Sequence, residues 1–433
     1  MRKYQFYIIS ALLIAAIAGN TESVLIEAEG NNFFSDNYLS GFLNRKRHRD
    51  IESVIQKILY LYNNTGYPFC RVEPEVVRET SESTKIILHI HEGAHVTITD
   101  YLYSSTGRTS DRILKKFAGG KTNSPFSLRI VNNIKNKLLR TGIFEKIVEN
   151  IVQQEDRYYL RVDIQERKSD FISLLGSYGE DNLNIFASIF TRNLLGTLRG
   201  LQFDYEQEKT FSLFYHDPIS IIPITIDGKF SLLTEDSARL TEFGGRILVP
   251  VNRFIDIGIS SGYESASNKI DTNANYRSNS AGLTAILHYQ DPLISLESNA
   301  DFDYLFRTID RRRFLYNGSI DIKRLLIAFH YRFVWTDSFN YFDYYRIGGA
   351  HNLRGYREDE FFARKARWFT IEYHRLPVFP MIDIGYVNDD FLFSYGFGIK
   401  AQNRLADATL IVAWPRAKNW REGKIHLLLI TGF

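Results

Sequence analysis

The chain has 433 residues, a formal net charge of +3 and 14% aromatic residues. The weak positive charge, without a basic run that interleaves with aromatics, argues against a nucleic-acid-binding protein. After residue 20 no apolar run approaches the roughly 18 residues of a membrane-spanning helix, so the abundant Phe and Tyr favour β-structure with one apolar and one polar face.

Residues 1–18 have the layout of a secretory signal peptide. Arg2 and Lys3 precede an apolar run from Phe6 to Ala18, which ends in small residues. The sequence therefore predicts an exported protein. An uncleaved anchor is the weaker alternative, because the apolar run is short for a membrane span.

Residues 23–93 and 94–169 repeat one pattern of strand, helix, helix, strand, strand. Alternating apolar positions in 158–164 mark the last strand of the second copy, and apolar spacing of three and four marks the helices. The matching positions of the two copies are Ser35-Asp36 with Ser110-Asp111, Gly66 with Gly142, and Glu92 with Glu166. The sequence therefore predicts two α+β units of βααββ order.

From residue 170 to the end, the pattern changes to strands with one apolar face. In residues 295–307 apolar and aromatic side chains take the even positions and mainly polar ones the odd positions, and residues 313–323 repeat this alternation. An apolar outside and a polar inside are typical of a membrane barrel. Residues 170–433 therefore predict an all-β transmembrane barrel of about 16 antiparallel strands, each of roughly ten residues.

The segment "IGGAHNLRGYREDEF" (347–361) lies in the longest predicted connection of the barrel, residues 338–365. The alternation of the two strands that follow places Glu372 and Asp383 on the polar, inward face. Two inward carboxylates on adjacent strands favour a cation between them, and the planar guanidinium of Arg354 can bond both.

Several motifs together resemble those of a known family. The two βααββ units, with their "GYPF" and "GIFE" turns, resemble POTRA (polypeptide-transport-associated) domains. Residues 353–356 resemble the (V/I)RG(F/Y) loop, and "MIDIG" (381–385) resembles an F-x-D-x-G strand in which Met381 replaces phenylalanine. With the aromatic carboxy terminus, the chain resembles the BamA/TamA-type outer-membrane protein assembly and translocation superfamily.

The resemblance implies two sites in the barrel. In the first, the loop 338–365 folds into the lumen and its arginine meets the acids of the next two strands. The residues of this ion-pair lock are Arg354, Gly355, Tyr356, Glu372, Asp383 and Gly385. In the second, the first strand (171–178) meets the last (424–433) at a lateral seam, where fewer or weaker bonds would let an open edge template a client strand. The seam residues are Phe171, Leu174, Gly176, Tyr178, Leu427, Leu429, Gly432 and Phe433.

The resemblance also implies the function. We predict an insertase or translocase of the bacterial outer membrane that accepts unfolded client chains through periplasmic POTRA domains and inserts or exports them through the barrel and its seam. The expected partners are unfolded outer-membrane or secreted clients, periplasmic or lipoprotein accessory factors and the lipid bilayer, without nucleic acid.

No enzymatic activity, cofactor or metal site is expected. "AGGKT" (118–122) ends like a phosphate-binding loop, but Lys115 stands where the first glycine is required. The histidines lack a matching set of acids or cysteines for a metal ion. Cys70, the single cysteine, is expected to pack as a small hydrophobe.

Two alternative functions remain. A two-partner secretion transporter exporting a dedicated partner shares the POTRA pair and the loop, but residues 19–23 would leave no room for its amino-terminal plug helix. A passive channel would give tandem POTRA domains no purpose.

Overall fold

The computed structural model describes residues 23–432 except 44–50, 79–82, 180–181, 208, 220–223, 236–237, 253, 271, 273–274, 292, 307–309, 338, 340, 376, 404–405 and 417–419. The predicted signal peptide, residues 1–18, and the carboxy-terminal Phe433 lie outside these residues. The chain divides into two compact units: one holds the chain up to Ser104 with 118–140 and 146–164, and the other holds 105–117, 141–145 and 165 onward.

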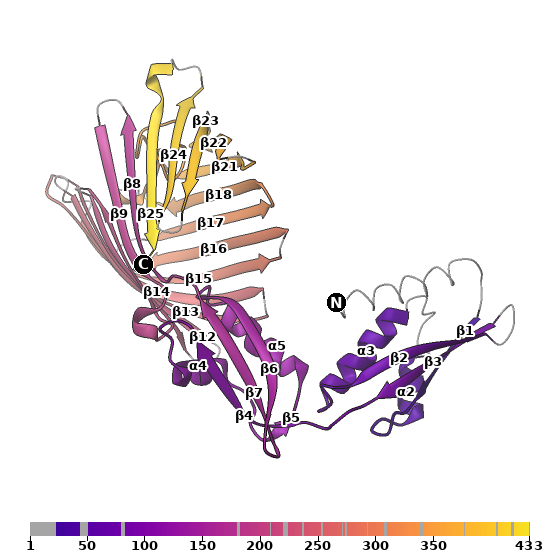
Figure 1. Cartoon of the computed structure of the whole chain (residues 1–433). Coiled ribbons are helices and arrows are strands. Elements are labelled where there is room, and N and C mark those ends of the chain that lie inside the picture. The colour runs from indigo at the N-terminus through magenta and orange to yellow at the C-terminus, as the bar shows by residue number, and fades with distance from the viewer. Residues whose placement is uncertain are drawn as a thin grey trace. The chain divides into compact units, whose positions relative to one another are not determined.

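The first unit begins with the elements β1 (Ser23–Glu29), α2 (Asp36–Leu43), α3 (Ile51–Asn63), β2 (Arg71–Arg78) and β3 (Ser83–His91). The strands form a sheet in the order β1-β3-β2, with β1 parallel and β2 antiparallel to β3 (Figure 1). Apolar residues at helical spacing in α3, among them Ile58 and Tyr62, are buried together with Ile86 and Leu88 of the sheet. This amphipathic helix therefore closes the core over one sheet face.

The next elements are β4 (Thr97–Ser105), α4 (Asp111–Ala118), β5 (Ser124–Pro125), α5 (Leu128–Leu139), β6 (Phe144–Gln154) and β7 (Arg157–Glu166). Their strands lie in the order β5-β4-β7-β6. The short β5 is absent from the predicted βααββ order. It arises because Gly119 and Gly120, with φ of +78° and +138°, turn the chain back so that Ser124 and Pro125 pair with the start of β4.

The matching acids of the sequence repeat make matching contacts. Glu92 accepts hydrogen bonds from the Phe33 backbone N–H at 2.7 Å and from the Tyr62 hydroxyl at 2.9 Å. Glu166 accepts from the backbone N–H groups of Arg108 at 3.2 Å and Thr109 at 2.8 Å. In each copy the acid therefore binds the turn that follows the first strand, before the first helix.

Within the described residues from 170 onward, sixteen strands close into an antiparallel barrel, which confirms the predicted architecture. They are β8 (Asp170–Gly179), β9 (Asn182–Thr191), β10 (Gly200–Glu206), β11 (Thr210–Ile219), β12 (Ile224–Glu235), β13 (Ala238–Pro250), β14 (Ile255–Asn268), β15 (Tyr276–Gln290), β16 (Ile294–Phe306), β17 (Arg311–Ile322), β18 (Leu325–Thr336), β21 (Lys365–Tyr373), β22 (Val378–Val387), β23 (Asp390–Gln402), β24 (Ala406–Pro415) and β25 (Lys424–Gly432). Figure 1 shows the first of them, β8, beside the last, β25, drawn in yellow.

The two faces of the barrel differ in polarity. Phe243, Ile259 and Leu283 are more than 60% exposed on the outer face, whereas Ser278 and Thr284 are buried on the inner face. The apolar outer face suits a bilayer, and closure pairs the backbone groups that lipid cannot satisfy. None of the helices in the described part of the chain is long and apolar enough to cross a membrane.

Candidate functional site

The connection between β18 and β21 forms a folded loop of its own. It contains a 3₁₀ turn, η3 (Tyr341–Asp343), and two short antiparallel strands, β19 (Tyr345–Ile347) and β20 (Phe361–Ala363). After β19 the chain turns at Gly348 and Gly349, with φ of +119° and +90°. A side chain at either position would collide with atoms of residues 357–360, so the turn requires glycine.

The tip of this loop buries Arg354 against two strands of the barrel. Arg354 is 6% exposed and Asp383 on β22 is fully buried. The Arg354 Nη2 lies 2.8 Å from Asp383 Oδ1 and its Nε 3.1 Å from Oδ2, and its Nη1 pairs with Glu372 on β21. Thr370 donates a further hydrogen bond of 2.8 Å to Asp383. The structure thus brings together the arginine and the two acids that the sequence analysis selected.

The other residues of the predicted lock hold the loop tip against neighbouring strands. The Tyr356 hydroxyl lies 3.2 Å from both the carbonyl oxygen and the backbone nitrogen of Phe393 on β23. A Cβ at Gly355 would lie 2.5 Å from the Cβ of Ser394, and one at Gly385 would lie 2.7 Å from the Cβ of Trp368. Both glycines therefore permit close packing that any larger residue would disturb.

An apolar cluster lies on the loop and on the strands that carry the ion pair. Leu353 of the loop packs with Trp368 of β21 and Val387 of β22, and all three are at most 3% exposed. Because Arg354 and Asp383 are themselves buried, little water reaches their contact, and this strengthens the charge interaction.

The predicted seam is closed in this structure. β25 pairs antiparallel with β8 from Ile425 opposite Tyr178 to Gly432 opposite Phe171. Leu174, Tyr178, Leu427 and Leu429 are exposed on the outer face, and Gly176 has open space beside it. Phe171 stacks on Phe190 with the ring centroids 4.9 Å apart. Phe433 lies outside the described residues.

The number of paired residues at the seam bears on the expectation that fewer or weaker bonds join it. Eight residue pairs join β8 and β25 in the described chain, whereas ten to thirteen join each neighbouring pair of strands from β11 to β18. Six pairs join β9 and β10 and seven join β21 and β22, so the seam is shorter than most ladders of the barrel but is not the shortest. That its bonds are weaker stays a prediction.

Two inward residues of the seam escaped the sequence analysis. His426 on β25 lies opposite Ser177 on β8, and both are at most 5% exposed. Nδ1 of His426 lies 3.0 Å from the Ser177 hydroxyl, and Nε2 lies 2.8 Å from the carbonyl oxygen of Arg354. Strand alternation could have placed both side chains inward, because their neighbours Leu427 and Tyr178 face outward.

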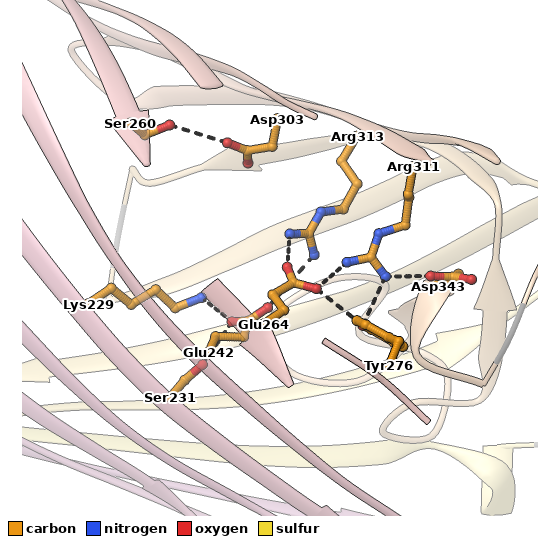
Figure 2. Close-up of polar contacts among 10 residues, drawn as sticks. All are labelled: Lys229, Ser231, Glu242, Ser260, Glu264, Tyr276, Asp303, Arg311, Arg313 and Asp343. Atoms are coloured by element: carbon orange, nitrogen blue, oxygen red, sulfur yellow. Dashed lines mark hydrogen bonds and ion pairs between the residues drawn. The ribbon is translucent and has the colours of Figure 1, made fainter. Parts of the chain in front are cut away.

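A second ion-pair cluster, also missed, binds the first half of the loop. Arg311 on β17 is fully buried between Asp343 of η3 and Glu264 on β14, and it pairs with both acids. Figure 2 shows Arg313 reaching the same Glu264 from beside Arg311, with Tyr276 at the other side of that carboxylate.

The cluster continues along the inner wall of the barrel. Glu242 on β13 accepts hydrogen bonds from Lys229 at 2.7 Å and Ser231 at 2.8 Å (Figure 2). The Ser260 hydroxyl lies 3.3 Å from Asp303. Arg311 and Arg313 thus pair with Asp343, Glu264 and Glu242, and these ion pairs compensate the buried charges through which the wall holds the loop.

Further contacts join the loop to strands on the other side of the seam. Asp359 lies 2.8 Å from Lys209 in the turn between β10 and β11. His351 packs edge-on against Phe186 of β9, with the ring centroids 5.0 Å apart. The loop is therefore held by β21, β22 and β23 on one flank of the seam and by β9 and the β10–β11 turn on the other.

Comparison with protein families and with curated proteins found no match for the chain. Solved structures do match its fold. BamA from Haemophilus ducreyi lacking POTRA domains 1–3 aligns with a TM-score of 0.56 and 15% identity over 96% of this chain and 100% of that chain.

CdiB proteins align similarly. CdiB from Acinetobacter baumannii gives a TM-score of 0.61 with 9% identity over 100% of this chain and 98% of that chain. CdiB from Escherichia coli gives 0.59 with 11% identity over 100% and 97%. The chain therefore has the fold of BamA-type outer-membrane barrels. The alignments with BamA and with CdiB both cover nearly the whole chain, so the similarity of fold is not confined to the barrel.

Proposed function

We propose that the chain is a member of the BamA/TamA-type superfamily and acts as an insertase or translocase of the bacterial outer membrane. The observation that carries the proposal is the loop tip bound inside a closed barrel of this fold, with Arg354 paired to Asp383 and Glu372. Such a barrel offers a lipid-facing wall, an inner polar surface and a strand junction, which are the parts that a strand-inserting machine needs.

We also propose that residues 23–93 and 94–169 form two POTRA domains and that these lie in the periplasm. Their support is the repeated element order and the matching roles of Glu92 and Glu166. In the described chain β2 lies at an edge of its sheet. An edge strand can bind an extended client segment through main-chain hydrogen bonds, with little demand on the client's sequence.

The proposed work needs no chemical step. The free energy comes from folding of the client and its partition into the bilayer, and the clients are unfolded outer-membrane or secreted chains. Accessory periplasmic proteins or lipoproteins would deliver these clients. The protein is proposed to be no enzyme and to use no cofactor.

The proposal is tested by depletion of the protein followed by quantitative proteomics of the outer membrane. A broad loss of barrel proteins supports an insertase, and complementation with the wild-type chain must restore them. Loss of one or two exported proteins supports the alternative, a two-partner secretion transporter, which the fold similarity does not separate from an insertase. An unchanged proteome, together with large and steady single-channel conductance of the purified protein, contradicts both and indicates a passive channel.

A further inference from the structure

His426 lies where three elements meet: the last strand, the first strand and the in-folding loop. It sits on β25 directly opposite Ser177 of β8 in the pairing register. Its two ring nitrogens contact different partners, the Ser177 hydroxyl at 3.0 Å and the carbonyl oxygen of Arg354 at 2.8 Å. The ring is 2% exposed, so water competes little for either contact.

The chemistry of the partners fixes the direction of both hydrogen bonds. A carbonyl oxygen only accepts, so Nε2 must carry the hydrogen that is donated to Arg354. In the neutral ring Nδ1 then has a lone pair, which accepts the hydrogen of the Ser177 hydroxyl. Ser177 of the first strand therefore donates to His426 of the last strand, and His426 donates to the backbone of the loop.

Arg354, whose carbonyl oxygen accepts the last of these hydrogen bonds, is also the residue that locks the loop. The guanidinium of Arg354 pairs with Asp383, and its backbone N–H also donates to Asp383 at 3.1 Å. A loop tip that leaves its site must break the His426 contact. A first strand that leaves the last must break the Ser177 contact, while His426 stays on β25.

We infer that His426 is a positioning residue that couples closure of the seam to seating of the loop, so that each state favours the other. The inference rests on the proposed function, because it concerns how the seam and the loop act together there. The loop already contacts both flanks of the seam through Asp359 with Lys209 and through Arg354 with Asp383. His426 adds the contact at the junction itself.

The coupling is reciprocal by thermodynamic necessity and can be measured without any client. Seam closure is read from disulfide formation between Leu174→Cys and Leu429→Cys, which face each other in the register. Loop seating is read from tryptic cleavage after Arg357, which is exposed at the loop tip but cut only when the surrounding chain opens. Both assays use the full chain in detergent micelles with Cys70→Ser.

Two conservative variants each keep half of the histidine's contacts. His426→Gln retains an amide that can donate to Arg354 and loses the acceptor for Ser177. His426→Asn retains an acceptor near the Nδ1 position and loses the reach to Arg354. Ser177→Ala removes the same contact as His426→Gln, so these two variants should behave alike. His216→Gln, which breaks a histidine contact to Asp227 between β11 and β12, is the matched control.

The expected result is a loss of coupling. In the chain that keeps His426, closing the 174–429 disulfide should slow cleavage after Arg357 by about threefold to tenfold. This is the effect expected of one or two hydrogen bonds. In His426→Gln, His426→Asn and Ser177→Ala the same disulfide should slow cleavage at least twofold less than in the chain with His426, because only the contacts of Asp359 and Arg354 to the two flanks remain. In His216→Gln the full effect should remain.

Equal slowing of cleavage in all backgrounds overturns the inference, since the loop would then sense the seam without His426. Folding is checked in each case by the heat-dependent shift in electrophoretic mobility. Ser177→Ala keeps the test decisive if the histidine variants fail to fold. Client handling is measured separately. A chain that handles no clients but keeps the coupling would contradict the proposed function alone, and a chain that handles clients without the coupling would contradict the inference alone.

Discussion

Arg354 binds Asp383 with three nitrogen atoms at once. Its backbone N–H and its Nε both donate to Oδ2 at 3.1 Å, and its Nη2 donates to Oδ1 at 2.8 Å. This carboxylate therefore fixes both the backbone and the side chain of the loop tip. Lysine, with a single ammonium group, could not reproduce the forked contact.

Arg354→Ala is expected to release the loop tip while the barrel still forms, because the strand ladder does not pass through this residue. Removing one partner of a buried ion pair leaves the other charge uncompensated, at about 3–5 kcal/mol. Arg354→Lys should restore only part of the loss. Cleavage after Arg357 and client handling in complementation measure the two effects.

The pair is tested as a unit by a double-mutant cycle. Asp383→Ala should resemble Arg354→Ala, and the double variant should be little worse than either. Glu372→Ala should be milder, because Arg354 then keeps all three of its contacts with Asp383. Strictly additive defects in Arg354 and Asp383 would show that the two side chains do not act together.

The second ion-pair cluster, around Arg311, predicts an order of effects among its members. Arg311→Met leaves both Glu264 and Asp343 buried without their shared cation, whereas Asp343→Asn leaves Arg311 paired with Glu264. Arg311→Met should therefore lower the free energy of unfolding by about 3–5 kcal/mol, and Asp343→Asn by less.

Denaturant unfolding in micelles measures this order, and tryptic cleavage after Arg346 measures loop release. Arg312→Met is the matched control, since Arg312 faces the other side of β17 and lies beside the Tyr304 ring. A larger loss in Arg312→Met than in Arg311→Met would contradict the role assigned to the cluster.

Strand alternation explains why the ion-pair lock of Arg354 could be predicted. In β21 and β22 apolar residues take one parity, so Glu372 and Asp383 fall on the inner face and can meet a cation. The same rule places Arg311, Glu264 and His426 inward. Parity alone, however, does not give their partners, because those depend on strand register and on where the loop crosses the lumen.

The loop itself has no periodic pattern from which its path could be read. Asp343 lies in the 3₁₀ turn η3 (Tyr341–Asp343), and its contact with Arg311 depends on where this turn lies within the barrel. The closed seam is a similar case. Its eight residue pairs follow from the register of β8 and β25, which a single sequence does not encode.

The contacts of Glu166 predict that the stability of the 105–117 segment, which lies outside the membrane-spanning strands, depends on pH. Burial raises the pKa of Glu166, but hydrogen bonds from Ser105, Thr109 and Arg108 outweigh burial and lower the pKa below its ordinary 4.5. Because the folded state binds this proton more weakly than the unfolded chain, the stabilisation is complete above pH 4.5 and is lost as the pH falls through the lower folded value.

Glu166→Gln should remove this dependence and destabilise the 105–117 segment by about 1–3 kcal/mol at neutral pH. A fluorophore on Arg112→Cys, in Cys70→Ser, reports urea unfolding of the segment at pH 3.5 and pH 7. Glu155→Gln, at an exposed turn, is the control. An unchanged pH dependence in Glu166→Gln would rule out this carboxylate as its source.

Cys70 should react slowly with thiol reagents in the folded protein. It is 8% exposed in the core of the first unit, and burial raises its pKa to about 11. The thiolate is the reactive form, so little of it exists at pH 8. Labelling with iodoacetamide should therefore be at least tenfold slower in the native chain than in urea, and equal rates would contradict the buried packing.

The last prediction concerns movement of the closed seam. If β8 and β25 must part for the protein to handle clients, a disulfide between Leu174→Cys and Leu429→Cys in Cys70→Ser should block that function, and reduction should restore it. These two residues are paired in the register and exposed on the outer face, so the bond can form without disturbing the lumen. A disulfide between Leu213→Cys and Phe230→Cys, paired residues of β11 and β12 away from the seam, is the control and should leave function unchanged. Full client handling by a quantitatively cross-linked 174–429 barrel would show that clients are inserted or exported without separation of these strands.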